Sequence, residues 1–242
     1  MTHRIFLAGA GGAIGRRLTP MFVAAGHPVV GTTRSAEKAH AIRELGAEVV
    51  VVDVFDAAAL ARAVAAAAPD IVIHQLTDLP RGLDPAMMDE AIRRNARIRT
   101  EGTRNLVDAA VAAGARRLIA QSIAWAYAPG SEPFDENAPL DLAAEGRRGV
   151  SVGGVVALER AVLDAPLEGL VLRYGQLYGP GTGVRMRDGA SPVHVDDAAR
   201  AVLLALDHGG RGVYNIAERG GSVDVAKADR ELGWRAEPRD PG

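Results

Sequence analysis

The chain has 242 residues, a formal net charge of −2 and no cysteine. This length suits one large α/β domain, and the near-neutral charge gives no reason to expect nucleic acid or an anionic membrane as a partner. Without cysteine there are no disulfides, no thiolate catalysis and no cysteine-ligated metal, and no apolar run approaches the ~18 residues of a membrane helix. We therefore expect no metal site and a cytoplasmic location.

Short apolar runs alternate with amphipathic stretches along the chain. We predict strands at 5–8, 29–32, 48–52, 71–74, 117–121, 169–173 and 213–216. We predict helices at 13–25, 36–45, 57–67, 85–113, 155–163 and 197–206. Continuously apolar strands that alternate with helices indicate a parallel sheet covered on both faces. The predicted fold is a Rossmann-type, doubly wound α/β sheet in a single domain, 1–242.

The first predicted strand leads into a glycine turn. Gly9, Gly12 and Gly15 follow the strand at three-residue spacing, and a helix begins within the turn, at Ala13 and Ile14. Glycines allow a tight turn and a close approach of backbone to a pyrophosphate, and the helix N-terminus offers free N–H donors. We predict a dinucleotide site here; the alternative is a tight turn that binds nothing.

The end of the second predicted strand bears on the choice between NAD and NADP. An NAD-selective site places an acidic residue there to accept from the ribose hydroxyls, but this chain has Arg34 and Ser35 instead. Arg34 could pair with a 2′-phosphate and Ser35 could add a hydroxyl contact, with Arg16 nearby in sequence. We predict NADP; Glu37, an acidic residue close to this strand end, keeps NAD as the less favoured alternative.

Several further motifs occur in a fixed order. They are GAGGAIG, the pair Asp53 and Val54, then IVIHQLT, EGTRNLVDAA, LRYGQLYGPG, HVDDAARAV, VYNIAE and DRELGWRAEP. This ordered set resembles the extended short-chain dehydrogenase/reductases, the NAD(P)-dependent nucleotide-sugar epimerase and dehydratase family. The resemblance implies that the three glycines bind the pyrophosphate, Asp53 and Val54 the adenine, and Gln75 and Leu76 the region beside the ribose. Tyr174 is expected near the nicotinamide.

The resemblance fails at the catalytic pair. The family uses a tyrosine as acid and base and a lysine four residues later that makes the phenol more acidic. Aligned on Glu159, this chain has Ser151 and Val155 at those positions. Ser122 matches the family serine, so we predict a substitute site of Ser122 with Tyr127 or Tyr174; simple packing of these residues in the cleft is the alternative. Trp125 is expected to form a wall of the cleft.

The segments that would recognise substrate are short. We expect a reduced substrate lobe from about 128–150, 180–192 and 217–242, which suits a small or polycyclic metabolite better than a nucleotide sugar. The leading hypothesis is an NADP-dependent oxidoreductase or epimerase-like enzyme acting on a carbonyl or hydroxyl. A non-catalytic NADP-binding sensor and a non-redox isomerase or dehydratase remain open, because fold alone does not determine chemistry. The sequence is compatible with a homodimer.

Overall fold

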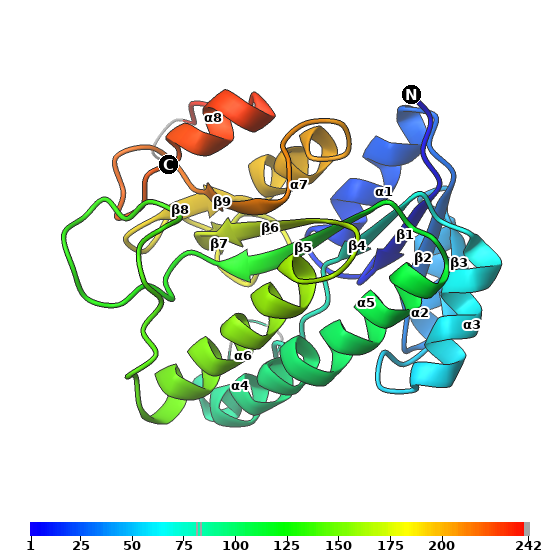
Figure 1. Cartoon of the computed structure of the whole chain (residues 1–242), viewed down its shortest axis with the longest axis horizontal. Helices are drawn as coiled ribbons and strands as arrows, with labels where there is room; N and C mark the ends of the chain where they lie inside the picture. Colours follow the sequence, from blue (N-terminus) through cyan, green and yellow to red (C-terminus); the bar gives the residue numbers. More distant parts are fainter. Residues whose placement is uncertain (81, 83, 240–242) are drawn as a thin grey trace.

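A seven-stranded parallel sheet forms the centre of the protein in the computed structural model, which describes residues 1–80, 82 and 84–239 (Figure 1). Its strands are β1 (Ile5–Ala8), β2 (Val29–Thr33), β3 (Glu48–Val51), β4 (Ile71–His74), β5 (Arg117–Ile123), β6 (Glu168–Tyr174) and β9 (Gly212–Ile216). They pair in the order β3-β2-β1-β4-β5-β6-β9. The order reverses between β1 and β4, and in doubly wound sheets ligands bind above the carboxyl ends of the strands at such a point.

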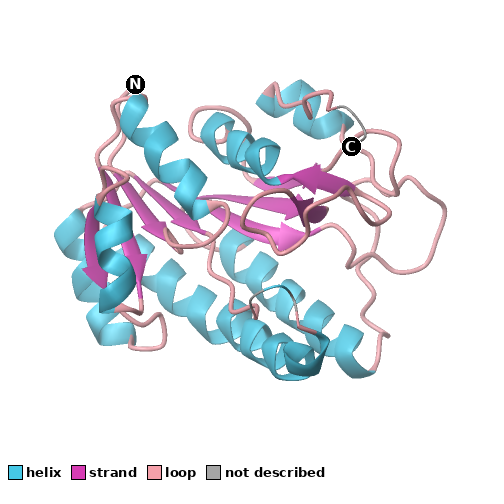
Figure 2. Ribbon diagram, turned by 180° about the vertical axis from the view of Figure 1, so that it is seen from behind, coloured by secondary structure: helices cyan, strands magenta, loops and turns pink. Residues whose placement is uncertain are grey.

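Helices cover both faces of the sheet (Figures 1 and 2). One face carries α1 (Gly15–Ala24), α2 (Ala36–Arg43) and α7 (Val195–Leu204), and the other carries α3 (Ala57–Ala67), α5 (Thr103–Ala112) and α6 (Gly146–Leu163). Fully buried Leu18 and Phe22 of α1 pack on the first face, and Leu60 and Leu106 pack on the second. Both sheet faces are therefore apolar, as the continuous strand pattern predicted, and the Rossmann-type fold is confirmed.

The helix predicted at 85–113 is not one regular helix. It consists of a short 3₁₀ turn η2 (Pro85–Met87), α4 (Met88–Arg97), a π turn η3 (Ile98–Gly102) and α5. The Thr103 hydroxyl donates to the Ile98 carbonyl at 3.3 Å across the π turn. The apolar periodicity continues on both sides of the turn, so the sequence pattern does not reveal it. Single π turns are frequent at functional sites.

Helix α6 begins at Gly146 rather than at residue 155. Its first half, GRRGVSVGG, is rich in glycine and has low intrinsic helix propensity. Packing favours the helix nonetheless, because Ser151 and Val152 are buried and Gly154 lies against α4. A Cβ at Gly154 would approach the Cα of Ala96 to 3.1 Å. Tertiary contact therefore decides where α6 starts.

Loops and short elements lie beside the carboxyl ends of the strands, where Figure 2 shows them gathered. They include the strand pair β7 (Gln176–Tyr178) and β8 (Pro192–His194) and the helix α8 (Ala226–Leu232). The Phe134 amide donates to Ser222 at 2.8 Å and joins the loop after β5 to the C-terminal segment. Of the predicted lobe, 146–150 belongs to α6, and 240–242 lie outside the described residues. In the described part of the chain, no helix has the length and apolarity to cross a membrane.

Candidate functional site

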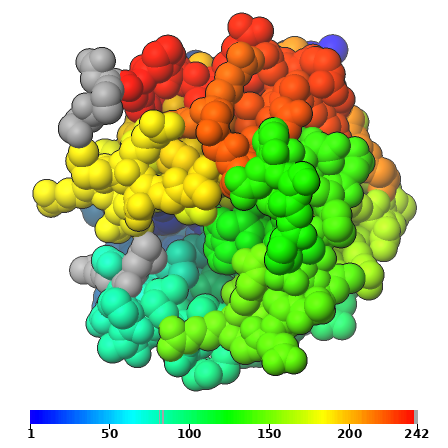
Figure 3. Space-filling model, turned by 90° about the vertical axis from the view of Figure 1, so that its left-hand side faces the viewer, coloured from blue at the N-terminus to red at the C-terminus, as the bar shows by residue number. Residues whose placement is uncertain are grey.

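A cavity of about 1080 Å³ opens at the carboxyl ends of the central strands. Residues that follow β1, β2, β4, β5 and β6 line it, together with residues of α4, η3 and the start of α6. Figure 3 shows the surface hollowed between the yellow segment around 180–190 and the cyan-green segment around 85–95. Ligand pockets in proteins usually have ~300–1,000 Å³, so this cavity has room for a large ligand or for two ligands side by side.

The glycine turn after β1 forms the floor of the cavity. Gly9 has φ +96° and lies so close to β4 that a Cβ would meet the Gln75 carbonyl oxygen at 2.6 Å. A Cβ at Gly15 would meet the Gly9 carbonyl oxygen at 2.2 Å, and at Gly12 the same oxygen at 3.3 Å. The spacing therefore reflects a backbone cradle in which side chains do not fit. In the described part of the chain no residue accepts from the amides of Ala13 and Ile14, which line the cavity.

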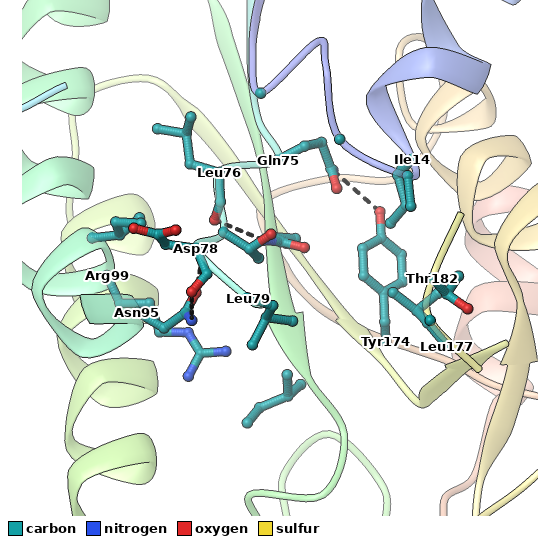
Figure 4. Close-up of a pocket in the computed structure, with 18 of the residues that line it drawn as sticks. Ile14, Gln75, Leu76, Asp78, Leu79, Asn95, Arg99, Tyr174, Leu177 and Thr182 are labelled. Atoms are coloured by element: carbon teal, nitrogen blue, oxygen red, sulfur yellow. Dashed lines mark hydrogen bonds between the residues drawn. The ribbon is translucent and has the colours of Figure 1, made fainter. Parts of the chain in front are cut away.

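Gln75 and Tyr174 face each other across the cavity floor (Figure 4). The Gln75 side-chain amide donates to the Tyr174 hydroxyl at 3.3 Å, and both residues are buried. The Gln75 carbonyl oxygen Oε1 is buried and has no hydrogen-bond donor among the described residues. Burial raises the pKa of Tyr174 above its ordinary value. At neutral pH this phenol keeps its proton, so it acts as a hydrogen-bond donor and is a poor source of protons.

Basic residues gather at the end of β2. Arg34, Ser35 and Lys38 line the cavity, and no acidic residue takes the position after β2. Arg34 is half exposed and lies 3.3 Å from Asp78. The Ser35 hydroxyl accepts from the Lys38 amide at 3.4 Å and caps α2. Lys38 was not predicted from the sequence as a residue of this site, although it lies only one turn beyond Arg34.

The two predicted adenine contacts differ in placement. Val54 is buried and lines the cavity, whereas Asp53 is exposed and is not among the described lining residues. The Asp53 carboxylate accepts from the Phe55 amide at 3.0 Å. Leu76 lines the cavity, and its carbonyl accepts from the Gln121 side chain at 2.9 Å. The carboxylate of Asp53 therefore fixes a turn at the mouth of the cavity, and its backbone neighbour Val54 forms the wall.

A buried polar network joins β5, β6 and α6 behind the cavity. Ser122 lines the cavity and donates to Glu159 at 2.8 Å. Glu159 also accepts from Arg173 at 2.6 and 2.9 Å. Arg173 donates to the Tyr127 hydroxyl at 2.8 Å, which in turn donates to Asn215 at 2.7 Å. No local sequence pattern indicates that Glu159 is the partner of Ser122.

Tyr127 is not among the described residues that line the cavity. It is buried within this network, where burial raises the pKa of its hydroxyl while Arg173 and Asn215 oppose that shift. Its hydroxyl already has an acceptor and a donor. We therefore correct the expectation that Tyr127 faces substrate: the loop after β5 turns this ring inward, against Phe134 at 5.3 Å between ring centroids.

The face of α6 that replaces the family's catalytic pair does line the cavity at Ser151, which is buried. Val155, one turn later, is fully buried among apolar side chains. Trp125 lines the cavity as expected and is 41% exposed. Arg148 holds the loop of Trp125 by donating to its carbonyl at 3.0 Å. The cavity therefore has a serine where the family has a phenol, and the residue at the position of the ammonium is an apolar side chain buried in the core.

His74 has a structural role at the end of β4. It is fully buried; its Nδ1 accepts from the Leu76 amide at 3.3 Å and its Nε2 lies 3.0 Å from the Thr103 hydroxyl. Burial lowers its pKa to about 4, so the ring is neutral at pH 7. It links the end of β4 to the π turn.

Comparison with known proteins agrees with this geometry. Residues 9–208 match a family model described as NAD(P)H-binding. The chain belongs to this NAD(P)H-binding family. It is also 45% identical over 227 residues to a 3-diazoavenalumate denitrifying reductase from Streptomyces sp., covering 93% of this chain and 71% of that protein. The class supported by these relatives is an oxidoreductase- or epimerase-like enzyme with a nicotinamide cofactor.

Solved structures share the fold. UDP-glucose 4-epimerase from Thermotoga maritima has a TM-score of 0.78 at 20% identity and covers 99% of this chain and 94% of its own. The enzyme WbmG from Bordetella bronchiseptica, solved with NAD and UDP, has a TM-score of 0.75 at 21% identity and covers 99% of this chain and 90% of its own. The resemblance to the extended short-chain family is thus confirmed at the level of fold, in a chain that lacks the tyrosine–lysine pair.

Proposed function

We propose that this protein is an NADPH-dependent reductase that removes a diazo group from a small unsaturated carboxylate and releases N₂. The observation that carries the proposal is the combination of a complete nucleotide cradle with Ser151 and Val155 in place of the proton-transferring pair. The name of the 45% identical relative, a denitrifying reductase of a diazo compound, supports the reaction class. The cofactor fits the residues present, because Gly9, Gly12 and Gly15 leave no room for side chains.

NADP is the cofactor that the end of β2 favours. Arg34 and Lys38 offer two cations and Ser35 a hydroxyl on one side of the cavity, where NAD-selective sites have an acid. The orphaned Oε1 of Gln75 offers an acceptor for a ribose hydroxyl or a carboxamide N–H. The free amides of Ala13 and Ile14 would face the pyrophosphate.

Diazo removal explains why the proton-transferring pair is dispensable. When bound, the reduced cofactor supplies one hydride. We take the diazo group to react in its diazonium form, R–N₂⁺. When this form gains a hydride it becomes R–H and N₂, so atoms and charge balance without an alkoxide. Reduction of a carbonyl instead leaves charge on oxygen, which needs a proton from an acid of suitable pKa. Here Tyr174 is held in its protonated form by burial, and Ser151 is a far weaker acid.

The remaining groups of the site bind and orient. The Ser122 hydroxyl donates a hydrogen bond to Glu159 at 2.8 Å, so its oxygen lone pairs are free to accept from a substrate hydroxyl. Tyr174 accepts from Gln75, which leaves its own O–H available as a donor. Trp125, Leu79 and Leu177 give the cavity apolar walls suited to a flat, unsaturated ligand.

The test is turnover of a carboxylated arenediazonium salt with NADPH, in which N₂ release and NADPH oxidation are measured together. We expect one N₂ per NADPH oxidised, and deuterium from the C4 position of labelled NADPH on the carbon that loses nitrogen. The reaction without enzyme controls for spontaneous loss of N₂. Tight NADPH binding without turnover would favour a sensor, and turnover without nicotinamide would favour non-redox chemistry. Either result overturns the proposal.

A further inference from the structure

Arg99, a charged residue of the π turn, enters the cavity and has no part in the proposed function described so far. Arg99 lies in η3, between α4 and α5, and lines the cavity. Figure 4 shows it on the same side as Asp78 and Asn95, opposite Tyr174 and Leu177. The cations at the end of β2 belong to another part of the cavity wall, so Arg99 marks a second positive region.

The fold holds Arg99 in this position by contacts from three elements. Thr103 closes the π turn onto Ile98 at 3.3 Å, and His74 of β4 lies 3.0 Å from the same hydroxyl. On the other side, α6 makes room for the arginine stem at Gly154, where a Cβ would be 3.4 Å from the Arg99 Cδ. The π turn and this glycine together direct the side chain along α6.

The guanidinium has no counter-ion in the described part of the chain. The nearby arginines of α4 are paired, Arg94 with Asp78 at 3.2 Å and Arg97 with Glu101 at 2.7 Å. Among the described residues, none accepts a hydrogen bond from Arg99 or lies within ion-pair distance of it. Glu159 is the acid whose charge reaches Arg99, but Ser122 and Arg173 already bind its two oxygens.

Partial desolvation makes an unpaired Arg99 a favourable partner for an anion in the cavity. Desolvation lowers the pKa of Arg99 to about 10, so the side chain is still charged at neutral pH. The side chain is partly exposed, and it lines the cavity. A partly desolvated charge without a protein partner gains from a ligand of opposite charge. Five N–H donors in a planar fork match a carboxylate in two-point contact.

We propose that Arg99 binds the carboxylate of the substrate and so fixes which end of the substrate faces Ser122 and Ser151. This inference rests on the proposed function for the identity of the substrate, whose carboxylate the relative's name also implies. Ser151 and Gly154 lie one turn apart on α6, so the arginine stem runs along the face that carries Ser151. Next to the face of α6 where the family has its proton-transferring pair, this chain therefore places a cation that binds the substrate anion.

The experiment compares Arg99→Met and Arg99→Lys with the wild type in binding to 4-hydroxycinnamate, its neutral carboxamide and NADPH, followed by tryptophan fluorescence. Arg93→Gln is the matched control, because Arg93 is exposed on α4 and pairs with Glu90 at 2.8 Å. We expect Arg99→Met to weaken carboxylate binding about 10- to 100-fold, and Arg99→Lys to weaken it less. Carboxamide and NADPH binding should stay within about twofold of the wild type.

Three results would overturn the inference. The first is an equal loss of affinity for the carboxylate and the carboxamide, and the second is a loss of affinity for NADPH instead. The third is unchanged affinity for the carboxylate in a variant whose thermal unfolding is normal. If Arg99→Met does not fold, Arg99→Lys decides between the same outcomes. The result is separable from the proposed function, since carboxylate binding that depends on Arg99 in a protein that does not release N₂ would support Arg99 and refute denitrification.

Discussion

Arg34 tests the choice of cofactor at the scale of a single residue. It lines the cavity at the end of β2, and its side chain is half exposed. If NADP is the ligand, we expect Arg34 to leave Asp78 and to bind the 2′-phosphate. A charge-assisted hydrogen bond at such a site contributes roughly 1.5 kcal/mol. We expect Arg34→Ala to weaken NADPH binding about tenfold and to leave NADH binding unchanged.

Fluorescence titration measures both dissociation constants, because Trp125 lines the cavity. Arg43→Ala is a suitable control, since Arg43 is an exposed residue at the end of α2 and is not among the described lining residues. Equal effects of Arg34→Ala on NADPH and NADH would contradict a 2′-phosphate contact.

At the scale of elements, Glu159 ties α6 to β5 and β6. Its carboxylate accepts from Ser122 and from Arg173, and the Arg173–Glu159 pair is buried on both sides. Removing one partner of a buried pair leaves the other charge uncompensated, which typically costs about 3 kcal/mol or more. We expect Glu159→Gln to lower the free energy of unfolding by about 3 kcal/mol, as measured by urea denaturation.

Glu168→Gln provides the comparison for this prediction. Glu168 also pairs with a buried arginine, Arg117, at 2.7 Å, but Glu168 itself is 38% exposed as a side chain. Arg117 further donates to the carbonyls of Ala205 and His208. Because water and these carbonyls compensate the charge of Arg117, Glu168→Gln should lower the free energy of unfolding clearly less than Glu159→Gln does. An equal decrease would show that burial of the Arg173–Glu159 pair is not the cause of the destabilisation.

The stability of the whole molecule depends on pH through His74. This ring is fully buried and its pKa is lowered to about 4, mainly by desolvation, against 6.5 in the unfolded chain. Between these values the unfolded state binds a proton that the folded state does not, so stability falls as pH falls. The contribution lost between pH 6.5 and 4 is about 3 kcal/mol.

Urea denaturation at several pH values between 4 and 7 measures this dependence. We expect His74→Gln to be less stable at pH 7 but to lose less stability on acidification than the wild type. His40→Gln is the control, because His40 is an exposed residue of α2 and should leave the slope unchanged. The same slope for wild type and His74→Gln would show that other groups cause the acid sensitivity.

The sequence by itself determined the strands, the glycine turn and the cofactor class. Apolar strands, a Gly9–Gly12–Gly15 cradle and Gln75 after β4 are local patterns, and the periodicity of a strand or the lack of a Cβ acts within a few residues. The family resemblance, aligned on Glu159, placed Ser151 and Val155 at the positions of the usual pair, and α6 does present Ser151 to the cavity.

Tertiary structure alone decided which side chains meet. Tyr127 turns away from the cavity because Arg173 and Asn215, 46 and 88 residues away in sequence, bind its hydroxyl. Glu159 becomes the partner of Ser122 across 37 residues. Arg99 enters the cavity because a π turn interrupts a helix whose periodicity looks unbroken, and because Gly154 of another helix leaves space. Such contacts depend on the packing of distant elements, which no local pattern encodes.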